Sequence, residues 1–417
     1  MEAHSRSVAG GAAGTLDRCR ELAAVSEEDG RLTRRFATPA MAQANVLVGG
    51  WMAEAGLEVR VDAAGNLVGH LPGTDPEAGT LLVGSHLDTV RDAGAFDGPL
   101  GVLAAVACVE RLRADGTQLP FALDVLGFSD EEGLRFGTAY LGSRAVAGRF
   151  DPELLALVDD DGVSVGEALR AFGGAPDEVA GASRHGERLL GYCELHIEQG
   201  PVLEERDVPV GVVDAIVGAT RVELEFTGRA GHAGTVPMAA RHDAVCAAAE
   251  WVVAVEAAAR REPGLVATVG RLEALPGAPN VIPGAVVASL DVRHADDALR
   301  TAAVQALHAE ARRAAAARGV QVQWRVQMQT QAVALDPDLT ALLAEAVSER
   351  GLPVVRLASG AGHDAVALSA ITGAAMLFVR CAGGVSHHPD ESVQEADVAV
   401  ALDVLHGFVV KMAGGAS

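Results

Sequence analysis

Residues 80–102 read TLLVGSHLDTVRDAGAFDGPLGV. The segment opens with an apolar run typical of a buried strand, and His86 and Asp88 stand where this run ends. Asp97 follows in a polar turn, before a helical pattern of small and apolar residues begins at Gly101. Open α/β sheets bind ligands beyond the carboxyl ends of their strands. A histidine and two aspartates at such an edge are candidate metal ligands with a supporting partner, although a solvated strand-to-helix loop would read the same way.

The size and charge of the chain restrict what it can do. Its 417 residues exceed the size at which one hydrophobic core usually stops growing, so we expect two domains. The 33 Lys and Arg against 56 Asp and Glu give a formal net charge of −23, which argues against a nucleic-acid or anionic-membrane partner. A small anionic substrate stays compatible with this charge, because the local charge of a site can oppose the global one.

The cysteines and the N-terminus indicate a cellular compartment. Five scattered cysteines without a CxxC pair are typical of reduced thiols. The N-terminus shows no secretory signal, and no apolar run is long enough to cross a bilayer. We therefore expect a soluble, cytoplasmic protein.

Strand and helix patterns alternate on both sides of the opening segment. They predict an α/β catalytic domain with a large mixed sheet covered by helices. The order of predicted strands and helices changes at residues 214–328. There it is strand-helix-strand-strand-helix-strand, which is the order of a ferredoxin-like α+β module. The simplest division is one catalytic domain, residues 1–213 and 329–417, interrupted by an inserted domain at 214–328.

Four clusters of polar residues follow predicted strands of the large domain. They are His86 with Asp88 and Asp97, the DEEG at 130–133, His196 in ELHIEQGP, and His387 in GGVSHHPDE. A lone histidine is more often structural, but three histidines with carboxylates are a natural set for two divalent cations that share a bridging carboxylate. Such a site also needs a carboxylate that moves protons rather than binding metal. Adjacent Glu131 and Glu132 fit this division, because neighbouring side chains in an extended chain point to opposite sides.

These motifs together resemble those of the di-zinc amidohydrolases of the aminoacylase/carboxypeptidase superfamily. The resemblance is carried, over nearly the whole chain, by SHLDTV, FDGPLGV, FSDEEGLRFG, ELHIEQGP, GRAGHAGTVPM and SHHPDE. More specifically, the motifs resemble the branch that contains allantoate amidohydrolase, N-carbamoyl-L-amino acid hydrolase and β-ureidopropionase.

The resemblance implies a role for each cluster. The implied ligands of two metal ions are His86, Asp97, His196, Glu132 and His387. Asp97 would bridge the ions, Asp88 would orient His86, and Glu131 would be the catalytic acid and base. A cis peptide bond after Asp97 is also implied. The ions would be zinc, with manganese or cobalt as alternatives, because mixed histidine and carboxylate sites accept all three.

Further residues would contact the substrate. The resemblance assigns His232, Asn280 and Arg293 of the inserted domain to this role, and Gln199 and Gly360 are additional candidates. An arginine can clamp a carboxylate with two hydrogen bonds, and His and Asn can stabilise an oxyanion. Because the inserted domain forms the dimer interface in this family, a homodimer through residues 214–328 is implied. It stays open whether these residues serve their own site or that of the partner subunit.

We therefore expect a di-metal hydrolase of a carbamoyl or ureido C–N bond that releases ammonia and carbon dioxide from a small anionic substrate. The segments FSDEEGLRFG and RRFATPAMAQA favour allantoate. A carbamoyl-L-amino acid, β-ureidopropionate, ureidoglycolate or another amide are the alternatives. A catalytically idle metal-binding scaffold is the other class, and the complete ligand set with an intact Glu131 argues against it.

Overall fold

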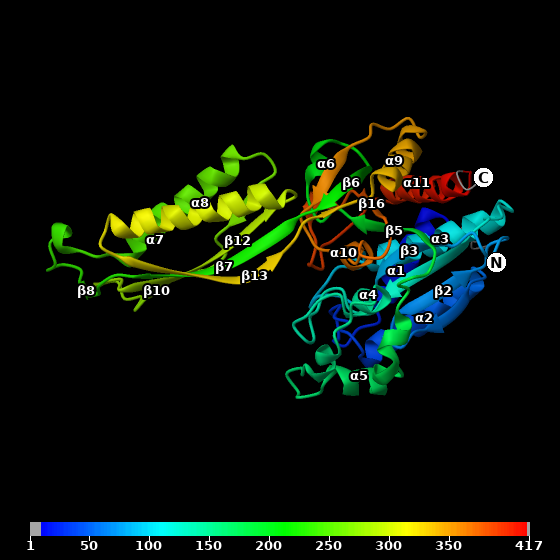
Figure 1. Ribbon diagram of the computed structural model, residues 1–417, viewed down its shortest axis with the longest axis horizontal. Helices are drawn as coiled ribbons and strands as arrows, with labels where there is room; N and C mark the ends of the chain where they lie inside the picture. Colours follow the sequence, from blue (N-terminus) through cyan, green and yellow to red (C-terminus); the bar gives the residue numbers. More distant parts are fainter. Residues whose placement is uncertain (1–9, 415–417) are drawn as a thin grey trace, which may run out of the picture. The chain divides into compact units, whose positions relative to one another are not determined.

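The computed structural model describes residues 10–414 of the chain (Figure 1). The chain divides into two compact units. The larger comprises Met1–Asp214 and Leu335–Ser417, and the smaller comprises Ala215–Ala334. The sequence predicts the inserted domain at 214–328. The compact unit ends later because its last long strand, β13 (Gln321–Thr330), is followed by the short strand β14 (Val333–Ala334).

A nine-stranded mixed sheet carries the functional clusters. Its order is β1-β2-β4-β3-β5-β16-β6-β14, and β15 pairs with β6. Besides β14, the strands of this sheet are β1 (Glu58–Val61), β2 (Leu67–Leu71), β3 (Thr80–His86), β4 (Ala122–Phe128), β5 (Leu189–Ile197), β6 (Val210–Ile216), β15 (Arg356–Ser359) and β16 (Ala374–Val379). The central strands β4, β3, β5 and β16 are parallel, so their carboxyl ends meet at one edge of the sheet.

Helices pack against both faces of this sheet. The helices of the larger unit are α1 (Ala12–Ala23), α2 (Pro39–Glu54), α3 (Pro99–Ala114), α4 (Leu141–Val146), α5 (Val165–Phe172), α6 (Val202–Glu205), α9 (Pro337–Ser348), α10 (Ala365–Leu368) and α11 (Glu395–Gly414). Helices α1, α3, α9 and α11 form one layer over the main core. Along β5, Leu195 and Ile197 face this layer, so His196 faces the other side, where α10 packs.

The smaller unit has its own antiparallel sheet and core. Its elements besides β13 and β14 are β7 (Gly218–Thr227), β8 (Gly231–His232), α7 (Ala244–Arg261), β9 (Val266–Thr268), β10 (Leu272–Leu275), β11 (Val281–Ile282), β12 (Ala285–His294) and α8 (Asp297–Ala316). The sheet order is β10-β12-β7-β13, with β9 beside β12, which is the predicted ferredoxin-like arrangement. The two helices pack on this sheet around the buried indole of Trp251. The predicted fold class is therefore confirmed.

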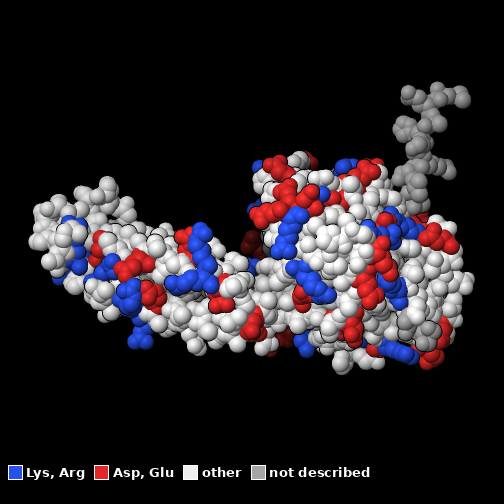
Figure 2. Space-filling model, turned by 90° about the horizontal axis from the view of Figure 1, so that it is seen from above, with Lys and Arg blue, Asp and Glu red and all other residues white. Residues whose placement is uncertain are grey.

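Two properties of the structure concern possible partners: the distribution of surface charge and the length and apolar character of the helices. Figure 2 shows acidic and basic side chains interspersed over the face that it draws. Within residues 10–414, no helix combines the length and the apolar character needed to cross a membrane.

Helix α3 approaches the sheet closely at Gly101. A Cβ atom there would lie 2.1 Å from the carbonyl oxygen of Leu195 and 2.7 Å from Cβ of Ser85. Both neighbours immediately precede site histidines on their strands. The glycine thus permits the packing that holds His86 and His196 at their spacing.

We predict opposite effects for two glycine-to-alanine changes in helices. Gly101→Ala should lower the free energy of unfolding by about 1–3 kcal/mol, because backbone and side-chain atoms must move aside. Gly50→Ala, in α2 with no atom within 4 Å of the added Cβ, should raise it by about 0.5–1 kcal/mol, because alanine favours a helix. Urea unfolding followed by circular dichroism measures both. Equal midpoints for the two variants would contradict the packing argument.

Candidate active site

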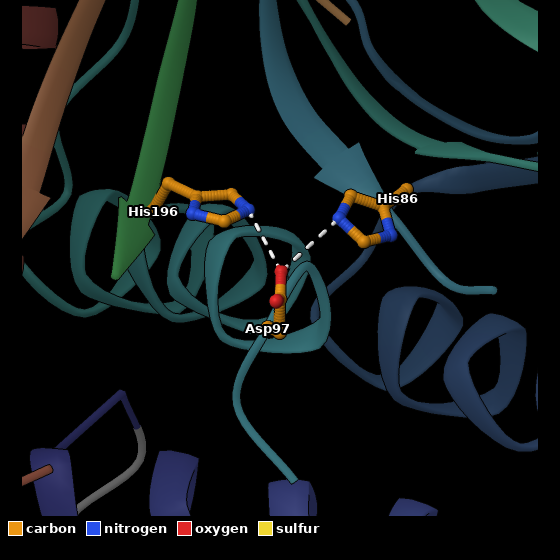
Figure 3. Close-up of side chains that lie close together, drawn as sticks. All are labelled: His86, Asp97 and His196. Carbon is orange, nitrogen blue, oxygen red and sulfur yellow. Dashed lines mark ion pairs between the residues drawn. The ribbon is translucent and has the colours of Figure 1, made fainter. Parts of the chain in front are cut away.

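His86, Asp97 and His196 converge at the carboxyl edge of the large sheet (Figure 3). His86 ends β3, His196 lies near the end of β5, and Asp97 comes from the loop before α3. Nε2 of His86 lies 3.5 Å from Oδ1 of Asp97, and Nε2 of His196 lies 3.1 Å from the same oxygen. All three side chains are buried, so these polar atoms face one another away from bulk water.

His387 and Glu132 extend the group on the second oxygen of Asp97. Nε2 of His387 lies 3.3 Å from Oδ2 of Asp97 and 3.4 Å from Oε1 of Glu132. Glu132 follows β4 and His387 follows β16. Each of the four parallel strands therefore leads to at least one residue of the group, because their carboxyl ends share one edge.

The donor spacing fits divalent cations. Two ligand atoms about 2.1 Å from a tetrahedral zinc ion lie about 3.4 Å apart. The four donor pairs around Asp97 are separated by 3.5, 3.1, 3.3 and 3.4 Å. The oxygens of Asp97 divide these pairs into two sets, so the arrangement could hold two ions with Asp97 between them.

Two histidines are oriented for ligation by their other ring nitrogen. Nδ1 of His86 lies 3.0 Å from the carbonyl oxygen of Asp88, and Nδ1 of His196 lies 2.9 Å from that of Ile197. Since a carbonyl oxygen only accepts hydrogen bonds, each Nδ1 carries the proton in these contacts. Nε2 is then left with the lone pair that metal binding requires.

Asp88 supports the site in two ways. Its carboxylate lies 3.5 Å from Nδ1 of His86, but the shorter contact to this ring comes from its carbonyl oxygen. The carboxylate also accepts the backbone N–H groups of Glu131 and Glu132, at 3.0 and 3.1 Å. Asp88 thus holds the turn from which both glutamates project, a contact that the sequence does not predict.

The electrostatics of the group favour cations. Burial opposes ionisation of Asp97, yet its contacts with His196, His387 and His86 hold its pKa well below the usual value. Contacts with Asp97 and Glu132 raise the pKa of His387 to about 10. Divalent cations bound among these groups would balance the charge of the carboxylates.

Glu131 differs from the other members of the group. Its carboxyl group is buried, and burial followed by the charge of Glu132 raises its pKa well above the usual value. A carboxyl group that binds a proton this readily suits general acid–base chemistry. Oxygens of both glutamates nevertheless lie within 4.8 Å of a nitrogen of His86, so their roles require a direct test.

The implied cis peptide bond after Asp97 is wrong. Among residues 10–414, the cis bond is Leu275–Pro276. Gly98 turns the chain instead with a φ of 81°, a region that glycine reaches without a steric penalty. A Cβ on Gly98 would lie 2.4 Å from Cε1 of His86, so the close approach of chain and ring also requires glycine.

Gln199 and Gly360 occupy different surroundings. Nε2 of Gln199 donates to Oδ2 of Asp97 at 2.8 Å, which places Gln199 directly against the candidate metal-ligand group. Gly360 is exposed in the loop after β15. This loop continues to the buried His363, whose ring meets that of His196 edge-on at 4.5 Å between centroids.

Two further residues contact Asp97 that sequence reasoning did not single out. Oγ of Ser386 donates to Oδ2 of Asp97 at 2.8 Å, and Oε1 of Glu391 accepts the backbone N–H of Asp97 at 3.1 Å. Their only signal in the sequence is their place beside His387 in the motif SHHPDE.

The three candidates of the smaller unit do not gather in one place. β8 and β11 continue the β7–β12 pair beyond its end, with His232 opposite Val281 and Asn280 just before it. Arg293 lies near the other end of β12. This strand has 10 residues, and at about 3.3 Å per residue its ends are about 30 Å apart. His232 and Asn280 are therefore neighbours, and Arg293 is remote from both within one copy.

The sequence profile described as peptidase family M20/M25/M40 matches residues 82–411, and the chain belongs to this family. This confirms the resemblance indicated by the motifs. Among curated relatives, an N-carbamoyl-L-amino acid amidohydrolase of Geobacillus stearothermophilus is 42% identical over 400 residues, covering 95% of this chain and 98% of the relative. A probable allantoate deiminase of Oryza sativa subsp. japonica is 38% identical over 429 residues, covering 95% and 87%. A solved amidase of the hydantoinase/carbamoylase family from Burkholderia multivorans has a TM-score of 0.93 at 33% identity, covering 98% and 99%.

Adding zinc or manganese to chelator-treated protein should raise its melting temperature. A ligand that binds only the folded state at 100 times its Kd adds about 2.7 kcal/mol to the free energy of unfolding. Asp97→Asn should lose most of this increase, because its amide nitrogen cannot ligate a cation. Asp124→Asn is the matched control, since Asp124 is equally buried but pairs with His70 and Arg184 outside the group. Equal metal responses in both variants would exclude Asp97 as a ligand.

Proposed function

We propose that the protein is a di-metal amidohydrolase that cleaves the C–N bond of a carbamoyl or ureido group, with allantoate as its substrate. The observation that carries this proposal is the division of ligand atoms between the two oxygens of Asp97, beside the buried Glu131. The names of the two curated relatives support the reaction class. The segments FSDEEGLRFG and RRFATPAMAQA favour allantoate.

A second substrate class has its own support. The relative that is 42% identical over nearly the full length is named as an enzyme for N-carbamoyl-L-amino acids. Allantoate and N-carbamoyl amino acids share a carboxylate and a terminal ureido group. The same residues can therefore bind either, and the choice depends on the group between these two ends.

In this proposal His86, Asp97 and His196 would hold one divalent ion, and Asp97, Glu132 and His387 the other. Zinc is the first choice, with manganese or cobalt as alternatives. When bound, such ions activate a water molecule and polarise the substrate carbonyl. The chain supplies the rest: the ring orientation of two histidines and the turn held by Asp88.

Glu131 would carry the proton. It takes a proton from the attacking water and delivers it to the nitrogen that leaves, so that one water and R–NH–CO–NH2 give R–NH2, carbon dioxide and ammonia. Its raised pKa suits both directions, because the carboxyl group binds a proton more readily than an ordinary glutamate and can release it again. The low exposure of the side chain limits exchange of this proton with solvent.

The smaller unit would complete the site in a homodimer through residues 214–328. Arg293 would clamp the substrate carboxylate, while His232 and Asn280 would stabilise the developing oxyanion. Gln199 and the backbone N–H of Gly360 would add contacts from the larger unit. Because about 30 Å separates the ends of β12, one small substrate cannot contact Arg293 and His232 of the same copy. This separation supports a site built from two subunits.

The remaining parts of the proposal concern location and other partners. All five cysteines are free, which supports a reducing compartment and hence the cytoplasm. The net charge of −23 supports a protein that does not bind nucleic acid.

Ammonia release tests the function directly. Zinc- or manganese-loaded protein should release ammonia from allantoate, and more slowly from N-carbamoyl-L-amino acids and β-ureidopropionate. A faster reaction with a carbamoyl amino acid than with allantoate would identify N-carbamoyl-L-amino acids as the substrate class instead. Loaded protein that releases no ammonia from any of them would exclude the proposed reaction.

Variants of the adjacent glutamates serve as controls in the same assay. Glu131→Gln should retain both metal equivalents and lose turnover by about 100-fold or more, because it keeps the shape but cannot move a proton. Glu132→Ala should lower metal content by elemental analysis. Loss of a metal equivalent in Glu131→Gln would reverse the two roles.

Mixed dimers test the shared site. Arg293→Ala and His232→Ala should each be nearly inactive alone, because each removes one contact from both sites of the dimer. Random mixing of the two variants should restore about a quarter of wild-type activity, since half of the dimers are mixed and each mixed dimer keeps one intact site. Mixed dimers that form without regaining activity would place both residues in the same subunit's site.

A further inference from the structure

Glu391 lies beneath the loop that carries Asp97. Its side chain is buried, and its Oε1 accepts the backbone N–H of Phe96 at 2.8 Å and that of Asp97 at 3.1 Å. These two N–H groups precede α3, so the helix offers them no partner. Because buried N–H groups require an acceptor, Glu391 fixes the backbone from which the Asp97 side chain projects.

The fit between Glu391 and this loop is tight. A Cβ atom on Gly94 would lie 2.3 Å from Cβ and 2.5 Å from Oε1 of Glu391. The chain at Gly94 therefore passes so close to Glu391 that no side chain fits between them. The position of the carboxyl group and the path of the loop depend on each other.

The segment that carries Glu391 also carries His387. Cys381 and Val393 form a β-bridge, and Ala382 donates its N–H to the carbonyl of Ser392 at 2.9 Å, so the segment between them is closed at its base. Glu391 stands at this base, next to Ser392.

Ser386 makes a second connection within the same segment. Its hydroxyl lies 2.8 Å from Oδ2 of Asp97 and 3.4 Å from Oε2 of Glu391. Asp97 is thereby held at its backbone by Glu391 and at its carboxylate by Ser386 and Gln199. The closed segment therefore contacts both the backbone and the carboxylate of Asp97.

We infer that Glu391 is a positioning residue, which ties the loop of Asp97 to the segment of His387 and so sets the spacing of these two residues for metal binding. The inference rests on the proposed metal-binding role of Asp97. It assigns no contact with substrate to Glu391. Removing the carboxyl group frees the Asp97 backbone and separates the two loops, while all the proposed ligands remain in the chain.

The acceptor oxygen, rather than the negative charge, performs this task. Both backbone contacts go to Oε1, which a glutamine also offers. Glu391→Gln should therefore retain the function that Glu391→Ala loses.

The test is metal affinity, measured on chelator-treated protein by competition with a chromophoric zinc chelator. Glu391→Ala should bind zinc about 10–100-fold more weakly than wild type, and Glu391→Gln should bind within about threefold of it. In the loaded enzyme, kcat should fall in the alanine variant with KM unchanged. Wild-type zinc affinity in Glu391→Ala, or equal weakening in both variants, would overturn the inference.

Two further variants separate positioning from a general loss of stability. Asp336→Ala removes another carboxylate that accepts two backbone N–H groups, at the start of α9, and should lower the melting temperature without changing zinc affinity. Gly94→Ala keeps Glu391 but displaces its carboxyl group, so it should weaken zinc binding even if Glu391→Ala does not fold. Unchanged zinc affinity in a folded Gly94→Ala protein would also count against the inference.

The outcome is independent of the substrate assignment. Zinc affinity that depends on Glu391 in a protein releasing no ammonia would uphold the positioning role and reject the proposed reaction. Ammonia release by a protein whose zinc affinity does not depend on Glu391 would uphold the proposed reaction and reject the positioning role.

Discussion

The carboxylate of Asp97 lies between two sets of histidine and carboxylate side chains that could hold metal ions, and the larger unit is arranged to bring both sets to it. One oxygen lies near His86 and His196, and the other lies near His387, which in turn contacts Glu132. The parallel arrangement of β4, β3, β5 and β16 brings these residues to one edge of the sheet. The close packing of α3 at Gly101 then sets how near the loop of Asp97 comes to the strands.

The charge around this carboxylate explains why the site should hold cations. Besides the proposed ligands, Asp130, Asp364 and Glu194 are buried nearby, and burial raises the pKa of each. Neighbouring carboxylates raise the pKa values of Asp130 and Asp364 further. A site with this excess of buried acid is stabilised by positive charge, which two divalent ions would supply in a small volume.

The residues of the candidate site were predictable where a side chain that can bind metal stands at the end of a recognisable strand pattern. His86, Glu132 and His196 stand at or just after apolar strand patterns, and the rule that ligands bind beyond the carboxyl ends of strands brought them together. The roles of Ser386 and Glu391 were not predictable in this way. Glu391 contacts a backbone 294 positions away, and nothing in its own neighbourhood indicates that distant partner. Likewise, the carboxylate of Asp88 supports two backbone N–H groups 43 and 44 positions further along the chain.

The sequence alone determined the fold class, the ferredoxin-like order of the inserted unit and the residue types of the candidate metal-ligand group, because periodicity, turn residues and ligand chemistry are local properties. The tertiary structure decided how the ligands divide between the two oxygens of Asp97, and it replaced the expected cis bond with a glycine turn at Gly98. It also separated Arg293 from His232 along β12, although the motifs suggest a common role. These features depend on distances between segments far apart in sequence, and only the packed chain sets those distances.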